Sequence, residues 1–165
     1  MIRVGFGYDV HRFESEKSDG ACVVICGVKI PFERSLIAHS DGDVGIHSAV
    51  DAILGAACID AARDIGQVFS PDDDRWKDRD SCYFLRTAKD LIEKNGLVIN
   101  NIDITIVCQK IRISTHREQM YTKIASILGL PLNKVNVKAT TTEMLGFEGR
   151  SEGISSYCVA SLLDV

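Results

Sequence analysis

Apolar residues fall into short runs along the chain, and the spacing within these runs predicts where strands form. Val and Ile are frequent in residues 1–10 and 21–30, and Gly, Ser and Pro bound both segments, which is typical of strands. The second strand is short and should end at Pro31. Three further segments have the same character and are predicted to be strands: residues 97–109, 135–141 and 153–163.

Between the first strands and the later ones, the apolar spacing becomes helical. In the segment from Ser40 to Asp60, apolar residues recur at spacings of three, four and seven: Val44, Val50, Ile53, Leu54, Ala57 and Cys58. Ser40, with Asp43 three residues later, resembles a capping box. We therefore expect this helix to begin within the segment HSDGD.

Two more helices are predicted from their end signals. One should start near Ser81 and stop at the Asn-Gly pair at residues 95–96. Another should start where Thr115 and Glu118 frame a second capping box, and it should end at Gly129.

The order of these elements predicts an α/β (α+β) sandwich in which the helices pack on one mixed sheet. No internal repeat or long linker divides the chain, so residues 1–165 are expected to form a single domain. The one strongly charged segment, residues 70–80, is by default a solvated surface loop. Its position between two helices also suits a mobile flap over a site.

Composition narrows the classes of function. Nineteen basic and 23 acidic residues give a net charge of -4, which argues against nucleic-acid binding through a broad basic surface. The apolar run at residues 52–59 is too short to span a membrane, so a cytoplasmic protein without membrane contact is expected. The six cysteines are scattered without a CxxC pair, and we interpret them as reduced core residues.

A candidate metal site combines one strand with the first helix. Asp9 and His11 are two residues apart, so a strand directs both to one face. His47 would add a second imidazole, and two imidazoles with a carboxylate describe an open, catalytic zinc site. An exposed polar strand end explains Asp9 and His11 equally well. Asp43, His47 and Asp51 also form one helical stripe, for which solvent exposure is the default interpretation of the two acids.

Two further segments carry groups that suit phosphate. His39 and Ser40 precede the first helix, whose N-terminal amides would form a phosphate cradle, or simply an N-cap. In residues 138–150, three threonines follow a strand, Lys138 and Arg150 supply cations, and Glu143 is a candidate magnesium ligand. β-branched threonines also favour strands without any function.

Taken together, these motifs resemble the 2-C-methyl-D-erythritol 2,4-cyclodiphosphate synthase family. The resemblance is carried in order along nearly the whole chain by DVH (9–11), AHSDGDVGIH (38–47), DAILGAA (51–57), DIG (64–66), VNVKATTTE (135–143) and LGFEGR followed by EG (145–153). It implies a ferredoxin-like α/β sandwich assembled as a homotrimer, with active sites between neighbouring subunits.

The resemblance also implies a reaction. The 2-phosphate of 4-diphosphocytidyl-2-C-methyl-D-erythritol 2-phosphate attacks the phosphorus that bears the methylerythritol, and CMP leaves, so the enzyme is a lyase of isoprenoid biosynthesis. By resemblance, Asp9, His11 and His47 bind zinc, and His39 with Thr141 stabilises the transition state. Glu143 would hold a second divalent ion, magnesium or manganese.

The resemblance places most of the substrate contacts in four regions. Asp64 to Gly66 would contact the sugar portions, the loop from Phe69 to Asp73 would fold over the methylerythritol, and Cys108 to Ser114 would form the cytosine pocket. Phe147 and Arg150 would face the interior of the trimer, where an isoprenoid diphosphate can bind. The full set of expected substrate-binding residues is Ser40, Asp64, Ile65, Gly66, Phe69, Asp73, Cys108, Arg112, Ile113, Ser114, Thr140, Thr142, Phe147 and Arg150.

In the cytosine segment, CQKIRIS departs from the family's usual residues, and Arg112 would take the place of a lysine. Two other functions use the same residues. A zinc-dependent phosphatase or phosphodiesterase would use the metal to activate water and would release inorganic phosphate. A cytidine-nucleotide-binding module would bind its ligand without turnover.

Overall fold

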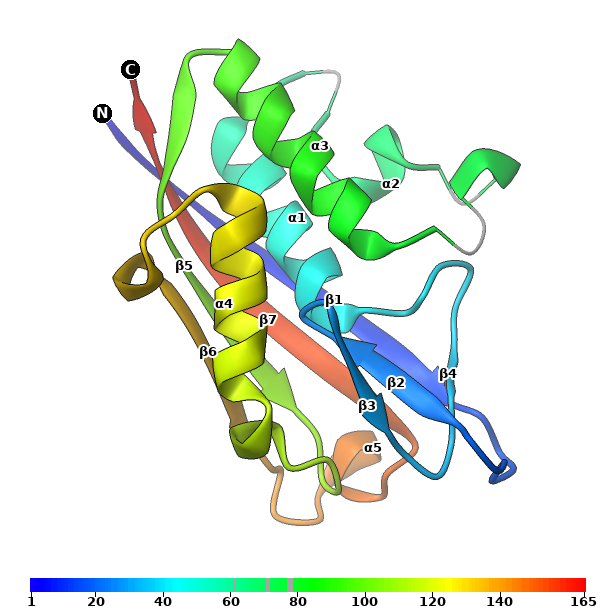
Figure 1. Ribbon diagram of the computed structural model, residues 1–165. Helices are drawn as coiled ribbons and strands as arrows, with labels where there is room; N and C mark the ends of the chain where they lie inside the picture. The colour runs from blue at the N-terminus through cyan, green and yellow to red at the C-terminus, as the bar shows by residue number, and fades with distance from the viewer. Residues whose placement is uncertain (61, 71, 77–78) are drawn as a thin grey trace.

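The computed structural model describes residues 1–60, 62–70, 72–76 and 79–165, and its centre is one mixed sheet (Figure 1). The sheet order is β4-β1-β7-β5-β6, in which only β5 and β6 run parallel. Its strands are β1 (Ile2–Phe13), β4 (Leu36–Ile37), β5 (Leu97–Val107), β6 (Val135–Thr140) and β7 (Gly153–Asp164). A separate hairpin is formed by β2 (Cys22–Ile25) and β3 (Val28–Pro31).

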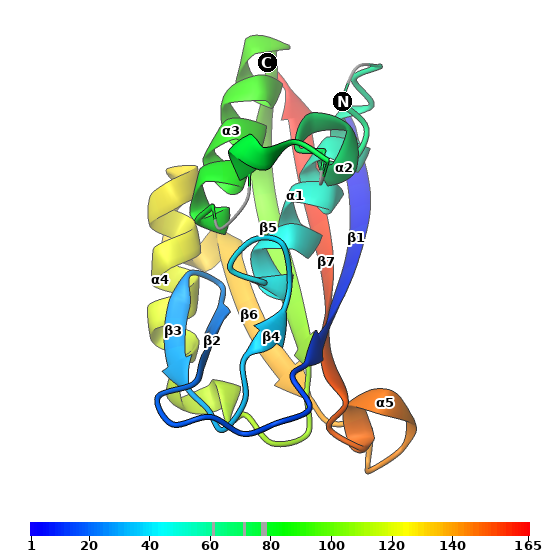
Figure 2. The same ribbon diagram turned by 90° about the vertical axis from the view of Figure 1, so that its right-hand side faces the viewer.

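Three long helices cover one face of this sheet, as the edge-on view in Figure 2 shows. They are α1 (Val44–Ala57), α3 (Ser81–Lys94) and α4 (Arg117–Leu128). The shorter helical elements are α2 (Ile65–Val68), η1 (Asp74–Trp76), η2 (Ile113–Thr115), η3 (Leu132–Lys134) and α5 (Gly146–Gly149). The predicted α/β architecture, with helices on one mixed sheet, is confirmed.

Helix α1 is the centre of the core. Of its 14 residues, 12 are buried, because β1 and β7 pack below it and α3 packs beside it. A helix that is apolar nearly all round must be buried in this way. The polar residue His47 therefore lies inside the protein, with only 9% of its surface exposed.

Strand β1 contacts α1 through glycines. A Cβ atom on Gly5 would lie 2.0 Å from the Ala52 carbonyl oxygen, and one on Gly7 would lie 1.9 Å from that of Ser48. The helix backbone therefore rests directly on the strand backbone, which only glycine permits. This close approach brings His47 within reach of Asp9.

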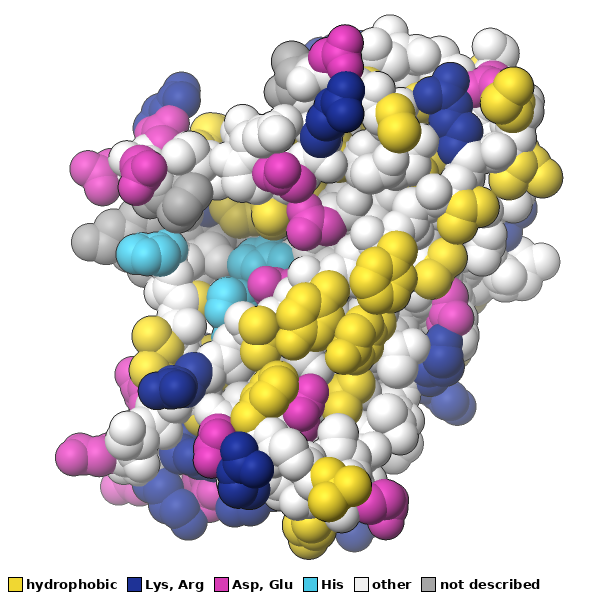
Figure 3. All heavy atoms as spheres, turned by 180° about the vertical axis from the view of Figure 1, so that it is seen from behind, with side chains coloured by type: hydrophobic (Ala, Val, Ile, Leu, Met, Phe, Trp, Pro, Cys, Tyr) yellow, Lys and Arg dark blue, Asp and Glu magenta, His cyan; other side chains and the backbone are white. Residues whose placement is uncertain are grey.

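The face of the sheet opposite the helices carries a band of exposed apolar side chains from β1 and β7, which crosses the molecule in Figure 3. On β1 the exposed fractions are 67% for Ile2, 66% for Val4 and 63% for Phe6. We call this band the outer stripe and define it as Ile2, Val4, Phe6, Tyr8, Val10, Tyr157 and Val159. Exposed apolar patches of this kind mark surfaces that bind other molecules.

Several local predictions were wrong. Residues 21–30 form a hairpin rather than one strand, because Cys26 and Gly27 both have positive φ (51° and 74°) and turn the chain. Helix α1 is capped by Asp43, whose carboxylate accepts the Ile46 amide, and not by Ser40. At α4 the Thr115 hydroxyl donates to the Arg112 carbonyl within η2, so the predicted capping box does not form.

The ends of the other helices agree with the sequence. Asp80 caps α3, whose last residue is Lys94, and Gly129 ends α4 in the left-handed conformation. All six cysteines are free, and four are buried as expected: Cys26, Cys82, Cys108 and Cys158. Cys58 is an exception, since it is exposed where it ends α1. Within the described residues, no helix has the length and hydropathy needed to cross a bilayer.

Candidate active site

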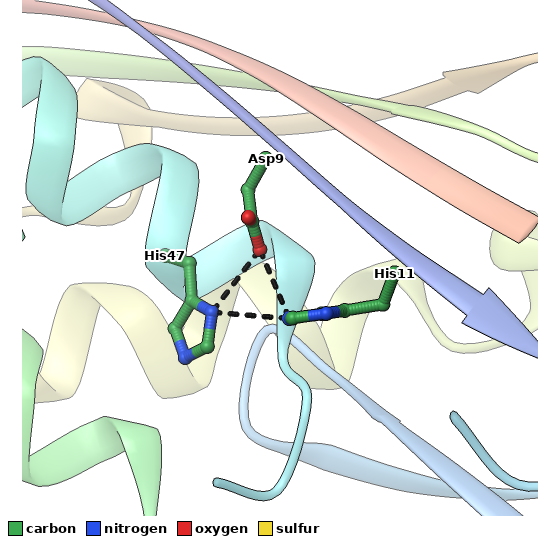
Figure 4. Close-up of side chains that lie close together, drawn as sticks. All are labelled: Asp9, His11 and His47. Atoms are coloured by element: carbon green, nitrogen blue, oxygen red, sulfur yellow. Dashed lines mark hydrogen bonds and ion pairs between the residues drawn. The ribbon is translucent and has the colours of Figure 1, made fainter. Parts of the chain in front are cut away.

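Asp9, His11 and His47 converge at the contact between β1 and α1 (Figure 4). The Asp9 Oδ2 atom lies 3.2 Å from His11 Nε2 and 3.1 Å from His47 Nδ1. The two ring nitrogens are 3.3 Å apart. The exposed-strand-end interpretation of Asp9 and His11 is therefore wrong, since a third residue from α1 completes a compact trio.

The trio fits a tetrahedral metal ion. Zinc bonds of about 2.0–2.1 Å in a tetrahedron place neighbouring ligand atoms about 3.3 Å apart. The three separations between Asp9, His11 and His47 are close to that value. One carboxylate oxygen and two imidazole nitrogens also form the donor set of open zinc sites. The described residues therefore include one group of side chains that could hold such an ion.

The charges of the trio are strongly coupled. Burial alone would raise the pKa of the Asp9 carboxyl, but hydrogen bonds from His11 and His47 outweigh it and hold that pKa well below its usual range. Burial alone would lower the pKa of His47, but its hydrogen bond with Asp9, together with the charges of Asp9 and Asp43, raises it. The site therefore keeps a carboxylate ionised in a largely buried position.

A cavity of about 280 Å³ opens beside the trio. Eight of the residues singled out from the sequence line it: His11, His39, Ser40, His47, Ile65, Gly66, Phe69 and Asp73. Asp74 and Trp76 of the charged segment line it as well, as does Phe84 of α3, although sequence reasoning assigned none of the three an individual role at the site. Trp76 could have been singled out from the sequence, because it is the only tryptophan of the chain and lies in an otherwise charged segment.

The charged segment is fixed to the protein by aromatic contacts. The Trp76 ring lies 5.4 Å from that of Phe69 and 6.2 Å from that of Phe84, between ring centroids. Asp73 pairs with Arg75 at 2.5 Å. The predicted flap also includes Pro71, and the charged segment includes residues 77–78, which lie outside the described residues. The described part of the segment is thus held by the aromatic contacts of Trp76, in addition to having the solvated surface that the sequence predicts.

The two acids that share a helical stripe with His47 have structural tasks. Asp43 is fully buried, contrary to the expected exposure, and its carboxylate accepts the amides of Cys26, Gly27 and Ile46. It holds the β2–β3 turn against the start of α1. Asp51 is half-buried and accepts the Ile65 amide at 2.7 Å, which fixes the start of α2.

This arrangement changes the predicted phosphate cradle. The Asp43 carboxylate already occupies the N-terminal end of α1, so an anion at that position is supplied by the protein itself. His39 and Ser40 lie one turn earlier and do line the cavity. Asp64 caps α2 by accepting the Gln67 amide at 2.8 Å, and it is not among the residues that line the cavity.

The threonine segment and the predicted cytosine segment form a second group. The Cys108 amide donates to the Thr140 carbonyl at 3.2 Å, and the Thr141 hydroxyl donates to Glu143 at 3.0 Å. Glu143 is exposed and has a φ of 53°, a strained conformation for a residue other than glycine. In the cytosine segment Cys108 and Ile113 are buried, whereas Arg112 and Ser114 are exposed.

The two cations proposed from this segment are already paired. Lys138 bonds to Asp103, and Arg150 bonds to Glu152 at 2.8 Å. Each of these cations thus has a carboxylate partner in its own chain, and a role of either one toward phosphate stays a prediction. Phe147 lies in a different hollow, on the outer face, together with Tyr8, Val10, His11 and Arg12.

Within one chain, the second group does not reach the cavity. All residues of 108–114 and 138–150 are described, and none of them lines it. The residues expected to act together are thus divided between the β1–α1 contact and the ends of β5 and β6 (Figure 1).

Comparison with known proteins identifies the family. A model described as the YgbB family matches residues 2–163. A 2-C-methyl-D-erythritol 2,4-cyclodiphosphate synthase from Methylococcus capsulatus is 49% identical over 162 residues, which cover 98% of both chains. The chain belongs to this cyclodiphosphate synthase family. The resemblance found in the sequence motifs is thereby confirmed.

Other members of the cyclodiphosphate synthase family are similar over the whole chain. The structure titled IspF (Plasmodium falciparum) CDP complex superposes with a TM-score of 0.83 and 34% identity, covering 99% of this chain and 96% of that one. The bifunctional enzyme IspD/IspF of Hyphomonas neptunium is 50% identical over 161 residues. This chain spans 41% of the length of the first curated relatives it matches, which are bifunctional.

Proposed function

We propose that the chain catalyses cyclisation of 4-diphosphocytidyl-2-C-methyl-D-erythritol 2-phosphate to 2-C-methyl-D-erythritol 2,4-cyclodiphosphate, with release of CMP. The observation that carries this proposal is the Asp9–His11–His47 trio beside a cavity, in a chain matched to the family from residue 2 to residue 163. A P–O bond forms between the 2-phosphate and the phosphorus that bears the methylerythritol. The P–O bond from that phosphorus to CMP breaks.

Asp9, His11 and His47 are the residues that would hold zinc. Bound there, zinc would supply Lewis-acid polarisation of phosphate oxygens and local positive charge. Glu143, with Thr141 beside it, would hold a second divalent ion. Magnesium and manganese suit this position, because magnesium uses one or two carboxylates and completes its shell with water and substrate phosphate.

The protein itself needs to supply no nucleophile, because the attacking oxygen belongs to the substrate. Catalysis then depends on positioning and on stabilising the charge that develops on phosphate. His39, which lines the cavity, would donate to a phosphate oxygen from the side of the trio. The Thr141 hydroxyl would do so from the second group.

The remaining substrate contacts are divided between the cavity beside the trio and the second group. Ile65, Gly66, Phe69 and Asp73 line the cavity and would enclose the methylerythritol, with Asp64 fixing the start of α2. Ser40 would bind phosphate there. In the second group, the residues expected to bind the diphosphate and the cytosine are Cys108, Arg112, Ile113, Ser114, Thr140 and Thr142.

We infer further that the chain works as a homotrimer with active sites between subunits. Two observations support this: the second group does not line its own chain's cavity, and the outer stripe exposes a sheet face that a neighbouring copy would cover. Phe147 and Arg150 would then face the interior of the trimer, where an isoprenoid diphosphate would bind. The ferredoxin-like relationship, the cytoplasmic location and the single-domain organisation stay predictions.

Phosphorus NMR of the purified chain with substrate, zinc and magnesium tests the reaction. We expect cyclic diphosphate to appear in step with CMP. His47→Ala should lose zinc and activity together, whereas His116→Ala, outside the trio and the cavity lining, should keep both. Inorganic phosphate without a cyclic product would indicate the phosphatase instead. An unchanged spectrum from folded, metal-loaded protein would indicate a binding module.

Mixing two inactive variants tests the shared site. His47→Ala removes a residue of the trio, and Thr141→Val removes a residue of the second group. If each site combines the two groups from different chains, trimers assembled from both variants contain some complete sites. Activity should therefore return on mixing and reassembly, and its failure to return from correctly mixed trimers would place both groups of a site on one chain.

A further inference from the structure

The His47 ring is held from the side that faces away from the trio. Its Nδ1 atom faces Asp9 and His11, whereas its Nε2 atom lies 2.8 Å from the hydroxyl oxygen of Ser81, the first residue of α3. Ser81 is completely buried, so this contact is not shared with bulk water. The Ser40 hydroxyl lies farther from Nε2, at 3.2 Å.

Ser81 is in turn fixed by Asp41. The Ser81 hydroxyl donates to one carboxylate oxygen of Asp41, and the Ser81 backbone amide donates to the other at 3.0 Å. Because a serine hydroxyl has one hydrogen, Ser81 can only accept from His47 once it donates to Asp41. His47 Nε2 must then carry a proton, which it donates to Ser81, while Nδ1 faces the Asp9 carboxylate. When Nδ1 gives up its own proton, its lone pair is directed at Asp9 and His11.

We propose that Asp41 and Ser81 are positioning residues that hold the His47 ring in the tautomer and orientation needed for metal binding. The inference deepens the proposed function, since it rests on the trio being a metal site. Neither residue is itself a ligand. Partners of this kind orient metal-binding histidines, and their removal typically lowers metal affinity about 10- to 100-fold.

Asp41 also has a structural role, because it accepts the backbone amide at the start of α3. A test must separate that role from positioning of the ring. Ser81→Ala does so, because alanine keeps the backbone amide and loses only the hydroxyl. Ser48→Ala is the matched control: Ser48 is also fully buried and follows His47 in α1, but its hydroxyl bonds to Ser156 at 2.8 Å rather than to His47.

Zinc affinity is measured by competition with a chromogenic chelator on the purified full chain. Ser81→Ala should bind zinc about 10- to 100-fold more weakly than the wild type, and Ser48→Ala should bind it within a few-fold. Asp41→Asn should weaken binding less than Ser81→Ala, since its amide oxygen still accepts one hydrogen bond. Equal losses in Ser48→Ala and Ser81→Ala would reduce the effect to core packing and overturn the proposal.

Proton–nitrogen NMR of the histidine rings, recorded on metal-free protein, gives a readout that does not depend on activity. The wild type should show a His47 Nε2 proton that its hydrogen bond to Ser81 protects from exchange with water, and Ser81→Ala should lose this protection. An equally protected proton in Ser81→Ala would overturn the proposal. If the wild type binds no zinc at the trio, the proposed function fails, but the ring spectra still decide whether Ser81 holds the His47 ring. Should Ser81→Ala not fold, Asp41→Asn provides the same two measurements.

Discussion

Gly7 of β1 and Ser48 of α1 are in backbone contact, so close that a Cβ atom on Gly7 would lie 1.9 Å from the Ser48 carbonyl oxygen. Asp9 is two residues from Gly7, and His47 directly precedes Ser48. The strand and the helix therefore carry the metal-site candidates immediately beside their closest approach. The geometry of the trio depends on this contact, because any separation of the two backbones separates Asp9 from His47.

Replacing Gly7 with alanine should therefore damage stability and metal binding together. The added methyl group meets backbone atoms that cannot rotate away, so we expect a loss of about 3 kcal/mol, the upper end of ordinary overpacking. Urea unfolding measures the stability, and chelator competition measures zinc affinity.

Gly55→Ala in the same helix is the control. A Cβ there meets nothing within 4 Å, so this variant should gain about 0.5–1 kcal/mol from helix propensity. If Gly7→Ala kept the stability and the zinc affinity of the wild type, this result would contradict the role given to the backbone contact.

Asp43→Asn should be strongly destabilising although it keeps the side chain's shape. One carboxylate oxygen of Asp43 accepts the Cys26 and Ile46 amides, and the other accepts the Gly27 amide at 2.6 Å. An asparagine NH₂ group must face at least one of these donors, which leaves a buried amide without an acceptor. We expect a loss of about 2–3 kcal/mol in the free energy of unfolding.

The exposed N-cap Asp80 offers a comparison for Asp43. Asp80→Asn should stay within about 0.5 kcal/mol of the wild type, since asparagine caps helices as well as aspartate does. If both variants lose the same stability, the cost at Asp43 arises from the lost helix cap alone rather than from the hairpin contact.

Trp76 should report on occupancy of the cavity. It is the only tryptophan, and it lines the cavity beside Phe69 and Phe84. A ligand that fills this space removes water from the indole ring, so we expect the emission to move to shorter wavelength when the cyclic diphosphate binds. Trp76→Phe should lose the signal and remain within about 1.5 kcal/mol of wild-type stability. Unchanged emission at saturating ligand would mean that the ligand binds away from the cavity.

Glu33 should make stability depend on pH in the acid range. Hydrogen bonds from Lys17 and then Lys110 lower the pKa of Glu33 to about 2, from an ordinary value of 4.5. A depressed pKa means that folding favours the ionised form, so its stabilising contribution is present above about pH 4.5 and is lost as the pH falls toward about 2. The difference in melting temperature between the wild type and Glu33→Gln should therefore be largest near pH 6 and shrink on acidification.

High salt should reduce the same difference, because exposed ion pairs are screened. Lys17→Met should reproduce the pattern, since it removes a partner of Glu33. A difference that does not change with pH would show that the two lysines contribute nothing through Glu33.

Much of the fold and the members of the Asp9–His11–His47 trio could be predicted, because local rules decide them. Residues two apart on a strand point to the same face, and this rule was enough to predict that Asp9 and His11 lie together. Apolar spacing located α1, and end signals located α3 and α4. The meeting of strand and helix was not visible in the pattern, because it depends on Gly5 and Gly7, whose lack of a side chain carries no hydrophobic signal.

The features that were missed are contacts between distant segments. Ser40 and Asp43 both resemble caps in sequence, and only the hairpin amides of Cys26 and Gly27 explain why Asp43 takes that position. The Asp41–Ser81 contact joins residues 40 positions apart. Trp76 stands out in the sequence as the only tryptophan, but its place in the cavity is set by its contacts with Phe69 and Phe84.

The two faces of strand β1 have different roles. Gly5, Gly7, Asp9 and His11 point toward the helices, while Val4, Phe6, Tyr8 and Val10 point outward into the outer stripe. Inserting or deleting one residue within this strand would exchange the two sets. The metal-site candidates would then face solvent and the aromatic rings would meet the backbone of α1. A change in length therefore keeps the two faces only if it comes in steps of two residues, and it must still leave glycine where the strand meets the backbone of α1.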